Sequence, residues 1–220
     1  MDQPAGPGWR VAGPGYWYTP LARGGFVPIV ARPMDLSIAI RTRRTVKSFT
    51  GAPVDRPTLT RLLDLAHQAP THRMTQPWRF AVLDQAAIKR LEAFLIATPA
   101  IAAVPDLQKG AAKLAKLRER LPTLGALIQV TWERAAKPEI DLEEHAAASA
   151  AVQNLLLAAT ALGLGSFWST NAAFGHPDVL RWCGADPARE GFLGAIWLGV
   201  AGEIPAPPTR LPLAAVTRWI

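Results

Sequence analysis

The stretch "RTRRTVKSF", residues 41–49, concentrates side chains that bind anions. Four cationic side chains and three hydroxyls fall within eight residues. An arginine guanidinium matches a phosphate group with two parallel hydrogen bonds, and Thr or Ser adds a neutral donor. The same residue types are also expected at an exposed helix end, where cations favour the C-terminal end of the helix dipole. Composition alone therefore leaves a phosphate site and a solvated helix end as alternatives.

A second stretch, "APTHRMTQPWRFAVLD" at residues 69–84, places His72, Arg73 and Gln76 directly before a strand candidate. A loop that only connects a helix to a strand needs none of these side chains. We expect Trp78 to pack in the core rather than to stack on a ligand. His72 fits either a solvated side chain or a ligand contact, and Arg73 has no assigned role.

Other common catalytic motifs are absent from the sequence. It has no Gly-x-Gly-x-x-Gly fingerprint, no Gly-x-x-x-x-Gly-Lys-Ser/Thr phosphate loop and no Gly-x-Ser-x-Gly nucleophile turn. The four histidines do not fall at metal-ligand spacing, and the single cysteine excludes a thiolate cluster, so no metal site is predicted. That cysteine, Cys183, follows Trp182 in a short helix candidate and is expected to be inert.

The hydrophobic pattern predicts helices and strands in mixed order. Helices are expected at 34–44, 58–68 (capped by Thr58), 85–97, 106–120, from Asp141 to about 163, and 176–184. Strands are expected at 79–84, 125–132, 166–170 and 192–200. The last strand is apolar on both faces, which is typical of a central strand. Because strands and helices do not alternate regularly, we predict an α+β fold with a sheet covered by helices.

Residues 146–177 contain no Asp, Glu, Lys or Arg, which raises the question of a membrane span. Gln153, Asn154 and many alanines make the segment only weakly lipophilic, and no basic cluster flanks it. A helix that is apolar all round is also what a protein core or a dimer interface needs. We therefore predict a buried helix, in which Gln153 and Asn154 satisfy polar groups, and no membrane contact.

The composition fits a globular protein, because half of the 220 residues are hydrophobic. The net charge of +7 favours anionic partners. No dense Lys/Arg block of the nucleic-acid-binding kind is present. The densest basic region, residues 109–120, contains Glu119 and is interpreted as a solvated helix face. With one cysteine and no visible signal peptide, a cytoplasmic protein is expected.

The first 33 residues differ from the rest, with six Gly and six Pro. Such a density is typical of linkers, but the aromatic residues Trp9, Tyr16, Trp17 and Tyr18 are not. Either this segment is an arm that packs on a partner subunit, or Met34 is the natural start. The predicted division is thus an extension at 1–33 and a globular domain at 34–220.

Four motifs in this order resemble the FMN-dependent nitroreductase family, especially its small bacterial branch with a histidine after Ala-Pro. They are "RRTVKSF", "APTHRMTQPWRF", "AAVQNLLLAATALGLGSFW" and "GFLGAIWLGV". The resemblance covers Met34 to about Val200. It implies a homodimeric α+β flavoprotein, an oxidoreductase with a mixed sheet flanked by helices and FMN buried at the dimer interface. NADH or NADPH (NAD, NADP) reduces the flavin, and a nitroaromatic, a quinone or a similar planar acceptor then takes the electrons.

The resemblance also assigns roles to residues. Arg43, Arg44 and Thr45 would hold the FMN phosphate and ribityl chain, and Lys47 would lie near the flavin edge where reduction builds negative charge. Helix 142–163 would be the central dimer helix. The other expected cofactor contacts are His72, Gln76, Trp168, Ser169 and Thr170, with Gln68 and Arg210 as further candidates and Gly163, Leu164 and Gly165 as the segment facing NAD(P)H. No protein side chain acts as a catalytic acid or base, because the flavin N5 carries the hydride.

Two departures and two alternatives accompany this resemblance. Met74 stands where many members have asparagine, and Arg210 is the one candidate for the basic pair near the C-terminus. A flavin-binding carrier or sensor without turnover would share every motif. A basic nucleic-acid-binding domain would instead show affinity that falls steeply with salt.

Overall fold

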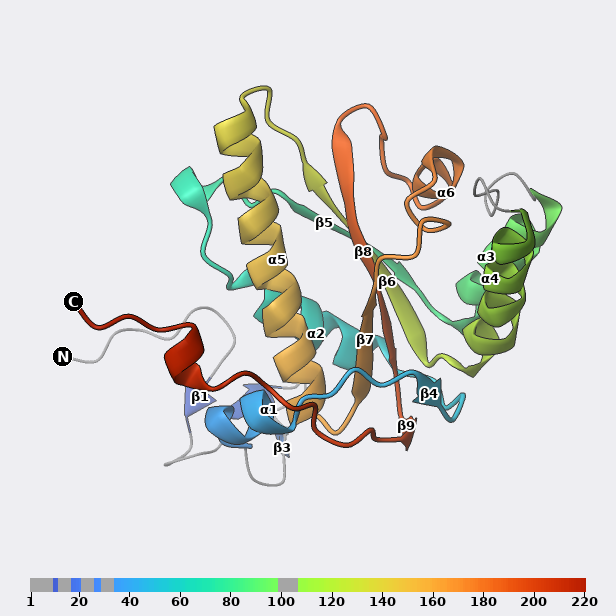
Figure 1. Ribbon diagram of the computed structural model, residues 1–220. Coiled ribbons are helices and arrows are strands. Elements are labelled where there is room, and N and C mark those ends of the chain that lie inside the picture. Colours follow the sequence, from blue (N-terminus) through green and yellow to red (C-terminus); the bar gives the residue numbers. More distant parts are fainter. Residues whose placement is uncertain (1–9, 12–16, 21–25, 29–33, 99–106) are drawn as a thin grey trace. The chain divides into compact units, whose positions relative to one another are not determined.

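The computed structural model describes residues 10–11, 17–20, 26–28, 34–98 and 107–220 (Figure 1). The chain divides into two compact units, Met1–Arg41 and Thr42–Ile220. Every residue that the sequence assigned to a cofactor site lies in the second unit.

The first unit contains a small antiparallel sheet and a helix. Its elements are β1 (Arg10–Val11), β2 (Trp17–Pro20), β3 (Phe26–Pro28) and α1 (Leu36–Thr42), of which Thr42 already belongs to the second unit. Trp9 and Tyr16, two aromatic residues of the proposed arm, lie outside the described residues. Whether residues 1–33 act as an arm stays a prediction.

The second unit is organised by a four-stranded antiparallel sheet. In spatial order its strands are β5 (Trp78–Leu83), β6 (Ala126–Glu133), β8 (Glu190–Gly199) and β7 (Gly165–Ser169). All four strands were expected from the sequence to within a few residues. The expectation of a central strand at 192–200 is confirmed, because β8 lies between two neighbours. Its continuous apolar run follows from cover on both faces.

Alternate residues of the inner strands feed two separate cores. From β6, Ala126, Ile128 and Val130 pack with α2 (Arg56–His67) and α5 (Pro138–Ala161). Leu127 points to the opposite face, where it packs with α3 (Gln85–Ala97), α4 (Leu107–Arg120) and α6 (Pro177–Trp182). Figure 1 shows α5 on one side of the sheet and α3, α4 and α6 on the other. Helices on both faces of this sheet confirm the predicted α+β class.

The long apolar helix α5 begins at Pro138 rather than at Asp141. It packs on the sheet through fully buried small and branched residues such as Ala148, Val152 and Leu155. Gly163, at φ 76°, ends it, because Leu164 N–H and Gly163 N–H bond back to Ala159 and Thr160. No helix in the described part of the chain has the length and apolar character that crossing a membrane requires.

The start of α2 differs from the sequence expectation. Asp55 caps this helix and accepts a hydrogen bond from the Thr58 backbone N–H at 2.8 Å. Thr58 was expected to be the cap, but it lies inside the first turn. Pro57 explains the shift, because proline is well tolerated in the first turn of a helix, where its missing N–H costs nothing.

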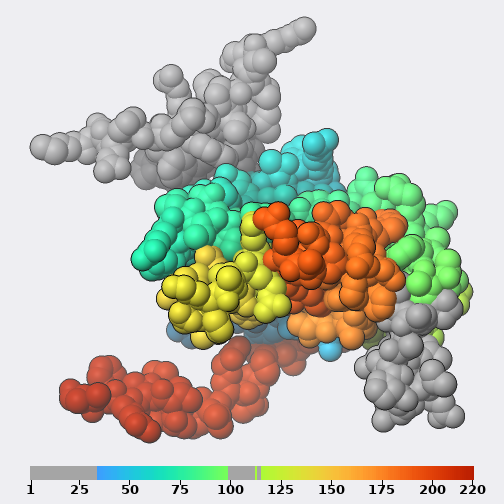
Figure 2. All heavy atoms as spheres, turned by 90° about the horizontal axis from the view of Figure 1, so that it is seen from above, coloured from blue at the N-terminus to red at the C-terminus, as the bar shows by residue number. Residues whose placement is uncertain are grey.

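Short elements complete the unit. The two-stranded pair of β4 (Ser48–Phe49) and β9 (Ala201–Glu203) was not expected, nor were the 3-10 turns at His72–Met74, Leu121–Thr123 and Leu213–Ala215. Residues 204–220, red in Figure 2, run away from the rest of this unit. They carry exposed apolar side chains, with Trp219 94% exposed.

Candidate functional site

The cationic segment 43–47 lies along strand β7. Thr45 forms a parallel bridge with Ser166, and the Val46 N–H donates to the Ser166 carbonyl at 2.9 Å. Val46 is buried directly over Gly165, where an added Cβ would lie 2.9 Å from a Val46 methyl group. The glycine thus lets the two segments approach closely, and this approach fixes Lys47 beside β7.

Lys47 lines a cavity of about 310 Å³ together with Ser169 and Thr170. Its ammonium lies 5.3 Å from the centroid of the Phe167 ring, a cation–π contact. The structure therefore brings together three of the residues that the sequence assigned to the cofactor. The remaining lining residues are Lys116, Leu117, Arg120, Phe167, Asn171 and Trp197.

Lys116 and Arg120 add a second role to the basic face of α4, on which Lys116 is exposed, as the solvated interpretation expects, and Arg120 is half-buried. Both line the cavity, so it holds three cations with Lys47, and no acidic side chain lines it among the described residues. Arg118 on the same helix is exposed and matches the solvated interpretation. The spacing of four residues between Lys116 and Arg120 placed them on one helix face, but the sequence did not show what that face meets.

Trp168 lies apart from this cavity, on the α5 side of the sheet. Its indole N–H donates to the Leu193 carbonyl at 3.0 Å, and the ring covers Gly194, where a Cβ would clash with it. The structure gives Trp168 a packing role within the described residues. Contact with a cofactor stays a prediction for this residue.

Both glycines of the segment 163–165 have structural roles. Gly163 needs its positive φ to end α5, and Gly165 makes room for Val46. The expected role of Gly163, Leu164 and Gly165 beside NAD(P)H stays a prediction.

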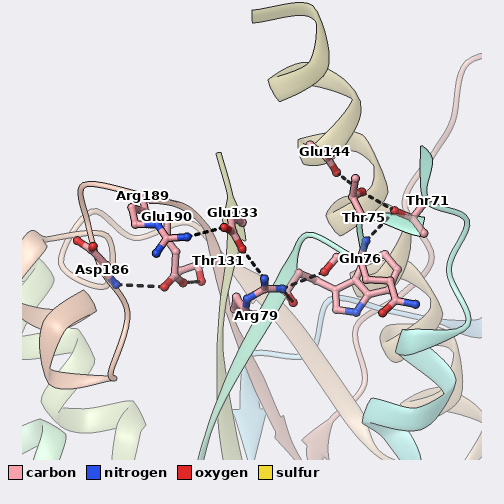
Figure 3. A network of polar contacts seen from close by, with 11 residues as sticks. Thr71, Thr75, Gln76, Arg79, Thr131, Glu133, Glu144, Asp186, Arg189 and Glu190 are labelled. Atoms are coloured by element: carbon pink, nitrogen blue, oxygen red, sulfur yellow. Dashed lines mark hydrogen bonds and ion pairs between the residues drawn. The ribbon is translucent and has the colours of Figure 1, made fainter. Parts of the chain in front are cut away.

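The loop before β5 is held by a chain of hydrogen bonds that Figure 3 shows. The Gln76 N–H donates to Thr71 Oγ1 at 3.0 Å, the Thr71 and Thr75 hydroxyls lie 2.9 Å apart, and Thr75 donates to Glu144 Oε2 at 2.7 Å. Since Thr75 gives its proton to the carboxylate, Thr71 must donate to Thr75. Glu144 is only 6% exposed. The chain of donors thus ends on a buried acceptor of α5.

The far side of the same loop is tied to the sheet. Arg79 donates to the Gln76 carbonyl at 2.9 Å and pairs with Glu133, which also binds Arg189 at 2.8 Å (Figure 3). These contacts hold an unusual backbone: Arg73, Met74 and Gln76 have φ values of 49°, 57° and 48°. Positive φ costs free energy at residues other than glycine. The loop is therefore specified by its surroundings rather than by local preference.

His72 and Gln76 do not meet the Lys47 cavity within one chain. Thr75 contacts Glu144 near the start of α5, while Val46 packs on Gly165 just beyond its end. From Glu144 to Ala161 the helix rises roughly 26 Å. The loop also precedes β5 at one edge of the sheet, and β7 forms the other edge. The predicted site residues thus form two groups, which we call the cation half (residues 43–47 and the Lys47 cavity) and the loop half (71–76).

Two further candidates, Gln68 and Arg210, lie outside both halves. Gln68 follows α2 and donates to the Asp64 carbonyl at 3.4 Å, and Arg210 is exposed in the tail 204–220. Arg43 and Arg44 are half-buried at the start of the cation half, and Arg44 also donates to the Arg43 carbonyl at 2.9 Å. Trp78 is buried, as expected, and donates to His67 Nδ1 at 3.0 Å.

Two titratable groups with shifted pKa values lie away from the cavity. Burial raises the pKa of the Cys183 thiol to about 11, which keeps it protonated and inert. Burial also acts to raise the pKa of Asp141, but hydrogen bonds from Trp132, the Ala135 N–H and Arg134 outweigh it, and the net pKa is lowered. Asp141 therefore stays ionised in the first turn of α5.

The Nitroreductase family matches residues 40–200. YfhC of Bacillus subtilis, provisionally named an NAD(P)H nitroreductase, is 27% identical over 174 residues, which cover 79% of this chain and 88% of YfhC.

Solved structures share the fold of this chain. A nitroreductase-like protein from Bacillus cereus superposes with a TM-score of 0.76 at 23% identity, covering 87% of this chain and 98% of that one. A provisionally named nitroreductase from Desulfovibrio desulfuricans, solved in complex with FMN, has a TM-score of 0.64 at 28% identity, covering 84% and 95%. The family match covers most of the second unit, and the fold is shared along most of the chain. This chain therefore belongs to the nitroreductase family.

Proposed function

We propose that this protein is a homodimeric, FMN-dependent NAD(P)H oxidoreductase that reduces nitroaromatics, quinones or similar planar acceptors. The observation that carries the proposal is the cation half: Lys47 is fixed beside β7 and lines a cavity with Ser169 and Thr170. Membership of the nitroreductase family supports the reaction class, and the relative from Desulfovibrio desulfuricans was solved with FMN.

The residues of the cation half fit FMN by their chemistry. Arg43 and Arg44 offer guanidinium donors and Thr45 a hydroxyl, which suit a phosphate. The Ser166 hydroxyl next to Thr45 is buried and has no hydrogen-bond partner among the described residues. When bound, FMN supplies the ring that accepts a hydride from NADH or NADPH and passes electrons to an acceptor. Lys47 contributes a fixed positive charge that favours the negatively charged reduced ring.

The separation of the two halves supports a site shared between subunits. One chain holds the halves at opposite ends of α5, so a second copy is needed to bring a loop half to each cation half. In a symmetric dimer the exchange would be mutual, giving two equal sites.

Two surfaces of the described chain suit such a dimer. Half-buried or exposed Ala146, Ala150 and Leu157 follow one face of α5 at helical spacing, which fits the expected dimer helix. The tail 204–220 exposes several large apolar side chains to solvent, which supports packing against a partner subunit. These exposed side chains are Ile204, Leu211, Leu213, Val216 and Trp219.

The test is the visible spectrum of the purified protein followed by stopped-flow mixing. We expect a yellow protein whose flavin absorbance is bleached by NADH or NADPH and restored by nitroaromatics or quinones. A colourless chain that takes up no FMN on titration contradicts the proposal. Bound FMN that neither nicotinamide bleaches would instead indicate a carrier or sensor.

A further inference from the structure

We propose that a second cavity, at the start of α5, binds the adenosine end of the nicotinamide donor. This cavity, which we call the Trp132 cavity, has a volume of about 420 Å³, and among the described residues it shares no lining residue with the Lys47 cavity. Its volume lies within the ~300–1,000 Å³ typical of small-molecule sites. The inference rests on the proposed function, because it names the part of the donor that the shared site would hold.

Two aromatic rings form a corner of the Trp132 cavity. Trp132 and His145 both line it and meet edge to face, with ring centroids 4.8 Å apart. The indole is held in place, because its N–H donates to Asp141 Oδ1 at 3.1 Å and because Gly191 leaves room for the ring where an added Cβ would clash. A planar base that enters this corner can stack on one ring and meet the edge of the other.

The carboxylate of Asp141 suits an amino group on that base. Burial raises the pKa of Asp141, but its hydrogen bonds lower it by more, so the carboxylate is ionised at neutral pH. It accepts hydrogen bonds from Trp132, the Ala135 N–H and Arg134. An ionised carboxylate has about four acceptor positions, so a position is left for a donor in the cavity. The exocyclic amino group of adenine is such a donor.

Arg134 suits the phosphate of a nucleotide. Its guanidinium lines the same cavity, is 58% exposed, and directs one N–H to Asp141 Oδ2 at 3.2 Å. A guanidinium has five N–H donors, so others remain for a phosphate group. Stacking surface, an acceptor for an amino group and a phosphate donor together fit an adenine nucleotide.

The Trp132 cavity lies beside the loop half. Asp141 and His145 line the cavity, and Glu144, between them on α5, accepts the hydrogen bond of Thr75 in the loop half. From Asp141 to His145 the helix rises only roughly 6 Å. In the proposed dimer the loop half meets the partner subunit's FMN. A donor whose nicotinamide lies on that flavin can therefore place its adenosine end in the Trp132 cavity.

The first test does not depend on turnover. The purified full-length protein is titrated calorimetrically with adenosine 5′-monophosphate (AMP). We expect His145→Ala to weaken AMP binding by about tenfold, because a ring of the corner is lost. Arg134→Gln is expected to weaken it by a similar factor, because the charged phosphate contact is lost. The matched control is Lys137→Gln, which removes an exposed cation three residues away that does not line the cavity, and it should leave the affinity unchanged.

Inosine 5′-monophosphate tests the role of Asp141. This nucleotide carries a carbonyl where adenine has its amino group, so we expect the unmodified protein to bind it about tenfold more weakly than AMP. Asp141→Asn is expected to remove the preference, because an amide can donate to the carbonyl as well as accept from the amino group.

A second test links the cavity to the donor. Stopped-flow bleaching of the flavin is measured with NADH and with reduced nicotinamide mononucleotide, which lacks the adenosine half. His145→Ala is expected to raise the apparent Kd of NADH by about tenfold and to leave that of the mononucleotide unchanged.

The outcomes separate this inference from the proposed function. If AMP does not bind, as when a partner subunit's tail fills the cavity, or if it binds His145→Ala as tightly as the unmodified protein, the inference is wrong. If NADH bleaches the flavin of both proteins alike, the function stands and the inference is overturned. If AMP binds through His145 and Arg134 but neither nicotinamide bleaches bound FMN, the proposed function fails and the adenine-nucleotide site stands.

Discussion

The loop half and the cation half differ in where their polar groups find partners. The loop half is bonded within the chain, because hydrogen bonds from Gln76 and Thr75 lead to the buried Glu144. Arg79, which follows the loop on β5, joins the Gln76 carbonyl to Glu133. In the cation half, Lys47, Lys116 and Arg120 meet in a cavity that no described carboxylate lines. The comparison indicates that the loop is built to keep a strained shape, whereas the cation half is built to receive negative charge from outside the chain.

The largest expected effect concerns the cation half. Arg43→Ala is expected to weaken FMN binding by about 1.5–3 kcal/mol, or roughly 10–100-fold in Kd, because a charged phosphate contact is lost. Fluorescence titration of the apoprotein with FMN measures the change. Arg118→Ala, which removes an exposed arginine, is the control. Equal FMN affinity in the two variants would mean that the segment 43–47 is ordinary surface.

The next effect concerns the stability of the loop half. Glu144→Ala removes the buried carboxylate that accepts the Thr75 hydrogen bond, and since hydrogen bonds to charged groups contribute most, we expect the free energy of unfolding to fall by about 2 kcal/mol. Urea denaturation followed by circular dichroism gives the value. The neighbouring Glu143→Ala removes a 53% exposed carboxylate, 3.8 Å from His72, and should cost less than about 1 kcal/mol. If both variants unfold alike, Glu144 does not anchor the loop.

A smaller effect concerns Asp141, in the first turn of α5. Its folded-state pKa is lowered by donors that outweigh burial, so its contribution to stability is present above the unfolded-state pKa of about 3.9 and is lost as pH falls through the folded-state value. Asp141→Asn should therefore cost less than about 1 kcal/mol at neutral pH, and the cost should shrink below about pH 4. Unfolding curves of both proteins at several pH values test this, and a cost independent of pH contradicts it.

The sequence predicted the regular elements well because their hydrophobic pattern is local. The continuous apolar run of β8 and the spacing of Leu59 and Leu62 in α2 each reflect burial that repeats along one element. The predicted N-cap of α2, Thr58, was wrong. Asp55 and Thr58 are both acceptable cap residues, and only the backbone geometry shows that Asp55 is the one used. The pair β4–β9 was missed because each strand is too short to show alternation.

The candidate site was predictable in its members but not in its arrangement. The motifs identified Lys47, Ser169 and Thr170, which the fold brings to one cavity. Nothing local indicates that His72 and Gln76 lie at the other end of α5, because that separation depends on strand order. Lys116 and Arg120 were visible as a basic helix, but their meeting with Lys47 joins segments about 70 residues apart in the chain, a contact that periodicity does not report.

Mixed dimers test the central claim, that each FMN site joins the cation half of one chain to the loop half of another. One differently tagged subunit carries Arg43→Ala/Lys47→Ala and the other His72→Ala/Gln76→Ala, and the mixed dimer is purified through both tags. The account predicts that each variant alone binds little FMN, while the mixed dimer regains about half of the unmodified protein's FMN content, since one of two symmetric sites is then intact. A mixed dimer that stays as colourless as its parents would contradict it, because a site built within one chain cannot be restored this way.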